Sequence, residues 1–247
     1  MISFSGRRVA AEALGTFFLV LIGPGAVMVN AYAGGLEQVG IALAFAFVVI
    51  AMVYALGHLS GAHINPAVTL AFWSVRRFPA TEVMPYIMAQ CTGAAGASLV
   101  LRATLGEVGE LGATLPRIAV ASAFVVEWLL SFALMFVIMA VATDERVADG
   151  FAALAVGLTV GFCALVGGPI TGASMNPARS FGPALIGGLW QTHWLYWLAP
   201  MTGMMAAARA YDFLRPAHAP RPPADATAPG VQGLISSASA RPTAHSP

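Results

Sequence analysis

The chain has 247 residues, of which 58% are hydrophobic and 9% are charged, and its mean hydropathy is +0.78. Soluble domains carry about 25% charged residues, so this composition excludes a water-soluble domain and indicates an integral membrane protein. The net charge of +1 provides no basic surface for a nucleic acid.

Six apolar stretches have about the length that a spanning helix requires, which is roughly 20 residues. In chain order they cover residues 8–29, 39–59, 82–102, 119–142, 150–167 and 193–213. The first is longer than the apolar part of a signal peptide and contains Glu12, so we expect a retained helix. We expect one transmembrane domain over 1–214 and a disordered cytoplasmic tail over 215–247, which is rich in Pro, Ala and Ser.

Two Asn-Pro pairs interrupt apolar sequence and are followed by apolar segments too short to span, at 66–75 and 177–187. Asn is a favoured helix N-cap, and Pro is favoured at the first helical position. We therefore expect two half-membrane, re-entrant helices that begin at Pro66 and Pro177.

The chain repeats itself internally. Asn65 and Asn176 are 111 residues apart, and Glu12 and Glu127 are 115 apart. Each repeat contains three spans and one half-helix, and because three is odd, the second repeat must enter the membrane from the opposite side. We expect an all-α membrane protein built from two inverted repeats, over about 7–103 and 119–213, with the half-helices meeting near the midplane.

Arginine placement predicts the orientation, because short cytoplasmic loops carry an excess of positive charge. Nine of the 12 arginines fall on one side, which places both termini in the cytoplasm. Arg102 and Arg117 fall on the other side, and Arg179, in the loop that enters from outside, is the exception. The Arg-rich, Lys-free composition is typical of a GC-rich bacterium and hence of an inner (plasma) membrane.

The half-helix starts combine acceptors and donors. If residues 60–64 and 171–175 are extended, they expose a row of carbonyls, while Asn65 and Asn176 add amide donors. Each half-helix N-terminus carries roughly half a positive charge, which repels cations and protons. This combination favours a small, neutral, hydroxylic solute.

Three further residues are assigned to the pore region. We expect His63 to line the cytoplasmic half of the pore. Glu12 and Glu127 are intramembrane acids, which are functional by default. We interpret them as supports whose carboxylates accept N–H bonds from the adjacent Asn-Pro loops, with proton carriage as the alternative.

The two loops resemble the signature loops of the aquaporin (major intrinsic protein) family, over about residues 7–214. The likeness is carried by two motifs: Asn65-Pro66-Ala67 and Asn176-Pro177-Ala178. It is greatest to the nodulin-26-like group and its bacterial relatives. The resemblance implies one pore per chain in a homotetramer.

The resemblance also implies a selectivity filter of Phe45, Ala164, Ala173 and Arg179. Strict water channels usually have His where this chain has Ala164. Glycerol facilitators have an aromatic residue in place of Ala173 and Asp in place of Ser180. Two alanines should widen the filter, so we expect solutes larger than water to pass.

The sequence therefore predicts a passive channel for water and small uncharged solutes, with protons and ions excluded. The first alternative is a dedicated glycerol, urea or metalloid (arsenous or boric acid) facilitator with little water flux, and a less favoured one is a proton-coupled secondary transporter. We expect no enzyme activity, no cofactor and no metal site. Cys91 and Cys163 are interpreted as small buried hydrophobes.

Overall fold

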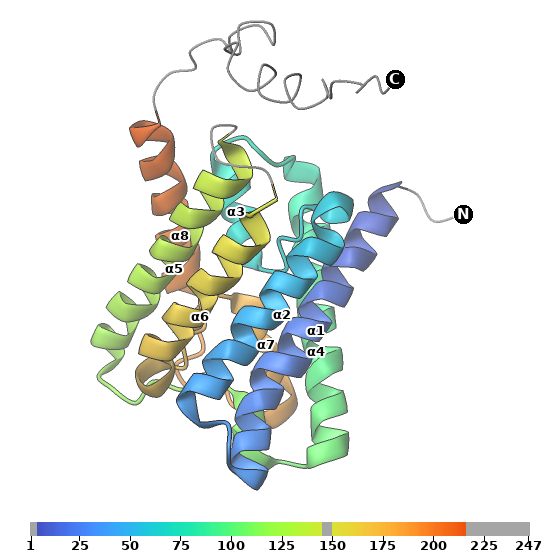
Figure 1. Cartoon of the computed structure of the whole chain (residues 1–247), viewed down its shortest axis with the longest axis vertical. Coiled ribbons are helices and arrows are strands. Elements are labelled where there is room, and N and C mark those ends of the chain that lie inside the picture. The colour runs from blue at the N-terminus through green and yellow to red at the C-terminus, as the bar shows by residue number, and fades with distance from the viewer. Residues whose placement is uncertain (1–3, 145–149, 216–247) are drawn as a thin grey trace, which may run out of the picture. The chain divides into compact units, whose positions relative to one another are not determined.

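The computed structural model describes residues 4–144 and 150–215, in which the regular elements are all helices. Arg146 and the predicted tail from residue 216 onwards lie outside the described residues. Six helices of 20 or more residues and two short ones make up the fold (Figure 1).

The elements follow the same order in both halves of the chain. The first half contains α1 (Phe4–Ala33), α2 (Glu37–Ser60), the short α3 (Pro66–Ser74) and α4 (Ala80–Leu105). A 3-10 segment, η1 (Val108–Gly112), leads to α5 (Val120–Thr143), α6 (Ala152–Thr171), the short α7 (Pro177–Gly187) and α8 (Leu195–Leu214). All six predicted spans and both predicted half-helices are helical, with every boundary within four residues of the predicted one.

Four of the long helices are long and apolar enough to cross a membrane by length and composition: Gly6–Ala33, Glu37–Ser60, Val120–Thr143 and Ala152–Thr171. The other two, α4 and α8, occupy equivalent places in the two halves. They are less apolar because small residues such as Gly, Ala and Thr take the place of large aliphatic ones along them.

The packing has the symmetry of an inverted repeat. Helix α1 packs against α2 and α4, as α5 packs against α6 and α8, and α2 packs against α6. Each short helix lies against the last long helix of the other half, α3 against α8 and α7 against α4. The start of α1 and the end of α8 lie at the same end of the bundle in Figure 1, as an even number of long helices requires.

Two equivalent glycines let helices approach closely. A Cβ on Gly93 of α4 would lie 2.1 Å from the carbonyl oxygen of Ala13. A Cβ on Gly203 of α8 would lie 2.5 Å from the carbonyl oxygen of Trp128. These carbonyls belong to the residues after Glu12 and Glu127, so the close crossings bring α4 and α8 against the helices that carry the two acids.

Adding a methyl group at either crossing should weaken the fold. We expect Gly93→Ala and Gly203→Ala each to cost about 1–3 kcal/mol, because backbone must move, and to lower the apparent Tm in detergent by roughly 5 °C. The control is Gly57→Ala, because a Cβ there meets nothing within 4 Å. Equal Tm values for the three variants would contradict the close-crossing interpretation.

His193 precedes α8 and is buried in the segment that joins α7 to α8. Its Nε2 accepts a hydrogen bond from Trp197 Nε1 at 3.0 Å, which requires that nitrogen to be unprotonated. Burial also lowers the pKa of His193 below its usual value. Protonation is therefore easier in the unfolded chain than in the folded one.

This predicts a pH dependence of stability with a defined sign. The stabilisation is complete above the unfolded pKa, about 6.5, and decreases as the pH falls below it, because the unfolded state then binds the additional proton. Thermal unfolding in detergent between pH 7.5 and 5.5 measures this slope. His193→Gln keeps an acceptor for Trp197 and should reduce the slope; an unchanged slope would show that His193 does not contribute to it.

Candidate functional site

The two short helices begin next to each other, and their asparagines bond reciprocally. Asn65 Nδ2 donates to the carbonyl oxygen of Met175, and Asn176 Nδ2 donates to that of Ile64, each at 2.8 Å. Each asparagine oxygen also caps its own helix: Asn65 Oδ1 accepts from Ala67 N at 2.9 Å, and Asn176 Oδ1 accepts from the second and third residues of α7. The predicted capping is confirmed, but one N–H of each amide is already used, which leaves a single donor per asparagine.

The backbone before each asparagine is not uniformly extended. Ala62 and Ile64 have φ values of 45° and 41°, and Ala173 and Met175 repeat them at 43° and 51°. Positive φ is unfavourable for residues with a Cβ, most of all for the β-branched Ile64. Two loops with the same strained pattern need strong support from their surroundings.

A buried carboxylate provides that support in each repeat. Glu12 accepts the backbone N–H groups of His63 at 2.9 Å and Ile64 at 2.6 Å. Glu127 accepts those of Ser174 at 2.9 Å and Met175 at 3.0 Å. Both acids are fully buried, so these contacts match the predicted supporting role rather than one in an open path.

Further side chains hold the two loops in matching ways. Ser60 and Thr171 donate a hydroxyl to Glu12 and Glu127, at 2.7 and 2.6 Å. Tyr86 and Tyr196 donate to the carbonyls of that same serine and threonine, at 2.9 and 2.6 Å. The tyrosine and hydroxyl positions correspond between repeats, but comparison of the motifs alone does not reveal their contacts.

The repeats differ at one point of this network. Gln90 donates to Glu12 at 2.8 Å and to Thr69 at 3.1 Å, whereas Pro200, at the corresponding place in α8, has no side-chain donor. In the second repeat, Thr114 of the loop after η1 donates to Ser180 at 2.7 Å. The short helix α7 is therefore tied to the connection between the repeats.

Two cavities meet at the predicted filter. The narrow cavity, of about 120 Å³, is bordered by all four predicted filter residues and by His63, Asn65 and Asn176. The wide cavity has about 670 Å³ and shares three of the filter residues with it: Phe45, Ala164 and Arg179. These three residues thus lie where the two cavities adjoin.

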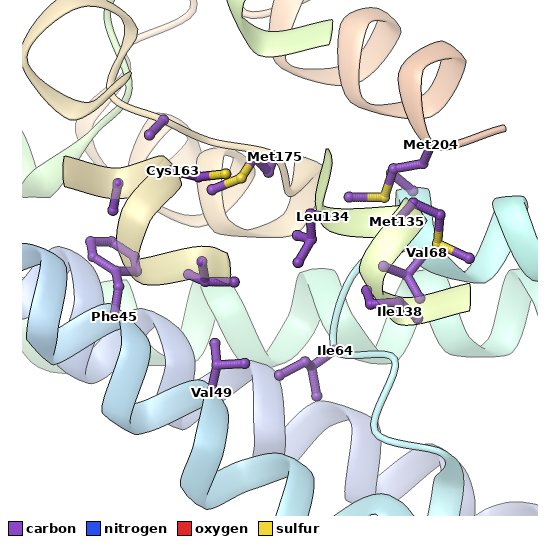
Figure 2. Close-up of a cluster of buried hydrophobic side chains, with 14 of the residues drawn as sticks. Phe45, Val49, Ile64, Val68, Leu134, Met135, Ile138, Cys163, Met175 and Met204 are labelled. Carbon is purple, nitrogen blue, oxygen red and sulfur yellow. The ribbon is translucent and has the colours of Figure 1, made fainter. Parts of the chain in front are cut away.

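The narrow cavity is mainly apolar. Figure 2 shows Phe45 and Val49 of α2 lying across from Leu134 and Ile138 of α5, and Met175 beyond them; all five border the cavity. Its polar groups come from Arg179 and from the two loops with their asparagines. Five loop residues that border it have a carbonyl oxygen to which no hydrogen bond is donated within the described residues: Gly61, Ala62, His63, Ala173 and Ser174.

Arg179 is held firmly in its buried place. Its Nη1 donates to the carbonyl oxygen of Gly112 at 2.8 Å, and its Cζ lies 5.1 Å from the centre of the Phe45 ring. Its Nε has no hydrogen-bond partner within the described residues. A residue that borders both cavities therefore carries a buried N–H without a protein acceptor.

Some predicted residues lie behind the cavity rather than on it. Of the two motifs, only the asparagines border the narrow cavity, and the following Pro-Ala pairs are buried in packing: Pro66, Ala67, Pro177 and Ala178. His63 borders the cavity with its Nδ1 3.1 Å from Thr69 Oγ1. Cys163 is buried away from both cavities, and both cysteines are free.

The sequence interpretation missed Gln38, which borders the wide cavity and bonds to the main chain of Ala164. Its spacing of seven residues before Phe45 was the available signal, since it places both on one face of a helix. No cluster of three or more His, Cys, Asp or Glu that could hold a metal occurs in the described parts of the chain.

Comparison with known proteins places these features in context. The sequence model of the family described as Major intrinsic protein matches residues 2–211. The chain is 48% identical over 210 residues to Aquaporin NIP1-4 of Oryza sativa subsp. japonica, covering 85% of this chain and 77% of that protein. It is 44% identical over 211 residues to Nodulin-26 of Glycine max, covering 85% and 78%.

A solved structure is also similar. The aquaglyceroporin from Plasmodium falciparum superposes with a TM-score of 0.77 at 26% sequence identity, covering 85% of this chain and 96% of that one.

Replacing either supporting acid by its amide should damage the loops. A glutamine at position 12 or 127 sets an NH₂ group against backbone N–H donors, and leaving one of these unsatisfied costs about 1–3 kcal/mol. We expect Glu12→Gln and Glu127→Gln each to lower the Tm in detergent and to reduce osmotic water permeability of proteoliposomes. Glu107→Gln, at an exposed acid paired with Arg102, is the matched control.

The same variants distinguish support from proton carriage. Solute flux measured with and without a pH gradient should be equal for the wild type. If the wild-type flux follows the gradient, and a variant keeps its Tm but loses that dependence, the acids carry protons and the supporting role is wrong.

Proposed function

Because the chain belongs to the major intrinsic protein family, we propose that its two cavities and the residues between them form one pore through each chain. The protein is a transmembrane channel for water and small uncharged solutes, and it is not an enzyme. The proposal concerns which residues select the solute and how wide they leave the path.

The selectivity filter in this proposal consists of Phe45, Ala164, Ala173 and Arg179. The observation that supports this filter is that three of its residues, Phe45, Ala164 and Arg179, line both cavities, and Ala173 lines the narrow one. Arg179 contributes donors and a positive charge that opposes cations, while Phe45 contributes an apolar wall. The alanines contribute only a methyl group each.

Proton and ion exclusion is assigned to the meeting point of α3 and α7. Both helix N-termini point their positive ends toward Asn65 and Asn176, which border the narrow cavity. A cation at this point faces two positive dipole ends, whereas a neutral hydroxylic solute can accept from the remaining amide N–H groups and donate to the free loop carbonyls.

The two alanines favour passage of solutes larger than water. A histidine at position 164 would extend an imidazole toward the shared border of the cavities, and an aromatic at position 173 would do the same from the loop. Both are absent, so glycerol, urea and metalloid hydroxides such as boric acid are the proposed larger solutes. The similar Plasmodium protein is named an aquaglyceroporin, which is consistent with a wide filter in this fold.

The proposed assembly is a homotetramer in the inner (plasma) membrane, with both termini in the cytoplasm. Because the number of long helices in the described residues is even, the start of α1 and the end of α8 lie on one side of the bundle. Large apolar side chains are exposed on several long helices, as a surface facing lipid or neighbouring subunits requires; examples are Phe47, Met88, Val125 and Phe162.

Narrowing the filter should change selectivity rather than flux alone. We expect Ala164→His to lower the permeability to glycerol and boric acid at least several-fold more than the permeability to water, because an imidazole fills the shared border. Stopped-flow light scattering of proteoliposomes after osmotic shock with each solute measures both.

The control is Ala155→His on the same helix, at a residue that borders neither cavity. Equal loss of all fluxes in Ala164→His would remove Ala164 from the filter. Wild-type vesicles no more permeable than empty ones to any solute would overturn the channel function itself.

A further inference from the structure

Gln38 lies two helical turns before Phe45 on α2, and both residues border the wide cavity. A spacing of seven residues keeps them on the same face of the helix. The polar side chain of Gln38 therefore stands at the approach to the residues where the two cavities adjoin.

The carboxamide of Gln38 is anchored. Its Nε2 donates to the carbonyl oxygen of Ala164 at 2.7 Å, which connects α2 to a filter residue of α6 through its main chain. Gly168 makes room for this contact, because a Cβ there would lie 2.4 Å from Gln38 Nε2 and 3.4 Å from Oε1. Anchoring through the nitrogen fixes where the oxygen lies.

The oxygen of this carboxamide is free to accept. No hydrogen bond to Gln38 Oε1 is formed within the described residues, and the side chain is only half-buried. The filter side chains include no acceptor: Arg179 only donates, Phe45 is apolar, and positions 164 and 173 are alanine. A solute with several hydroxyl groups needs both a donor and an acceptor on entering such a site.

We propose that Gln38 is a specificity-determining residue at the mouth of the filter, where Oε1 accepts a hydrogen bond from a hydroxyl of a neutral polyhydroxylated solute. Arg179, whose Nε lacks a partner, donates to an oxygen of the same solute. The inference rests on the proposed passage of such solutes. Water gains less from this pair, because a single small molecule bonds equally well to neighbouring waters in the wide cavity.

The test compares solutes in proteoliposomes that contain the full chain. Gln38→Leu keeps the side-chain volume and removes both the anchor and the acceptor. We expect the permeability to glycerol and boric acid to fall about fivefold relative to that of water, the effect of one lost hydrogen bond. Gln191→Leu is the matched control, because this exposed glutamine borders neither cavity.

Gly168→Ala tests the same residue without altering it. The new methyl group displaces the Gln38 carboxamide from its place, so this variant should reproduce the selectivity change. The double variant should show no further change, because the second substitution removes a contact already lost. Size-exclusion profiles and Tm values show whether each variant is folded. If Gln38→Leu does not fold, the selectivity of Gly168→Ala alone tests the proposal.

Three results would overturn the proposal, and they are distinguishable. Equal changes of water and solute fluxes in the folded variants would assign Gln38 a structural role only. Additive effects in the double variant would show that Gly168 acts on something else. A wild-type protein that passes water but neither glycerol nor boric acid would overturn the wide filter as well as the role of Gln38.

Discussion

The whole arrangement depends on one constraint: two pieces of non-helical backbone lie inside an apolar bundle, and their N–H groups need partners. In lipid an unsatisfied backbone group costs several kcal/mol, so irregular backbone survives only where protein or water satisfies it. Glu12 and Glu127 accept two such N–H groups each, and one donor in each pair, Ile64 or Met175, has a positive φ. The strained loop residues, the buried acids and the unbonded loop carbonyls therefore belong to one arrangement that keeps non-helical backbone inside the bundle.

The two asparagines also hold the loops in place. Each uses its oxygen to begin its own helix and its nitrogen to bond the opposite loop, so neither half-helix is placed independently of the other. Glycines after Ser60 and Thr171 end the preceding long helices in the left-handed conformation, with φ of 87° in both. The same capping residues thus end a long helix and begin a short one in each repeat, so that the two loops meet at the asparagines.

The proposed selectivity filter lies where the two repeats differ. Arg179 occupies the place that Val68 has in the first repeat, and it is held by Gly112, a residue outside both repeats. The short helix α7 is tied to the same connection through Thr114, whereas α3 is tied to α4 through Gln90. In the proposed filter, Arg179 and Gln38 provide the polar groups, and the two alanines provide space.

Much of this could be predicted from the sequence alone. Hydropathy and length determined the long helices, and the Asn-Pro pairs determined the starts of α3 and α7, because capping is a local property of a few residues. The odd number of spans per repeat determined the inversion. The spacing of the two acids pointed to their loops, because each acid lies early in the first spanning helix of its repeat.

Contacts between segments distant in the sequence could be identified only from the tertiary structure. The reciprocal bonds of Asn65 and Asn176 join residues 110 and 112 positions apart, and no local pattern specifies which carbonyl an amide will reach. The positive φ values occur where side chains distant in sequence or at the end of the preceding helix accept the backbone N–H groups, which overrides the local preference for extended backbone. Gln38 was missed for the same reason: a lone polar residue near a helix end acquires its meaning only when Gly168 and Ala164, from another helix, pack against it.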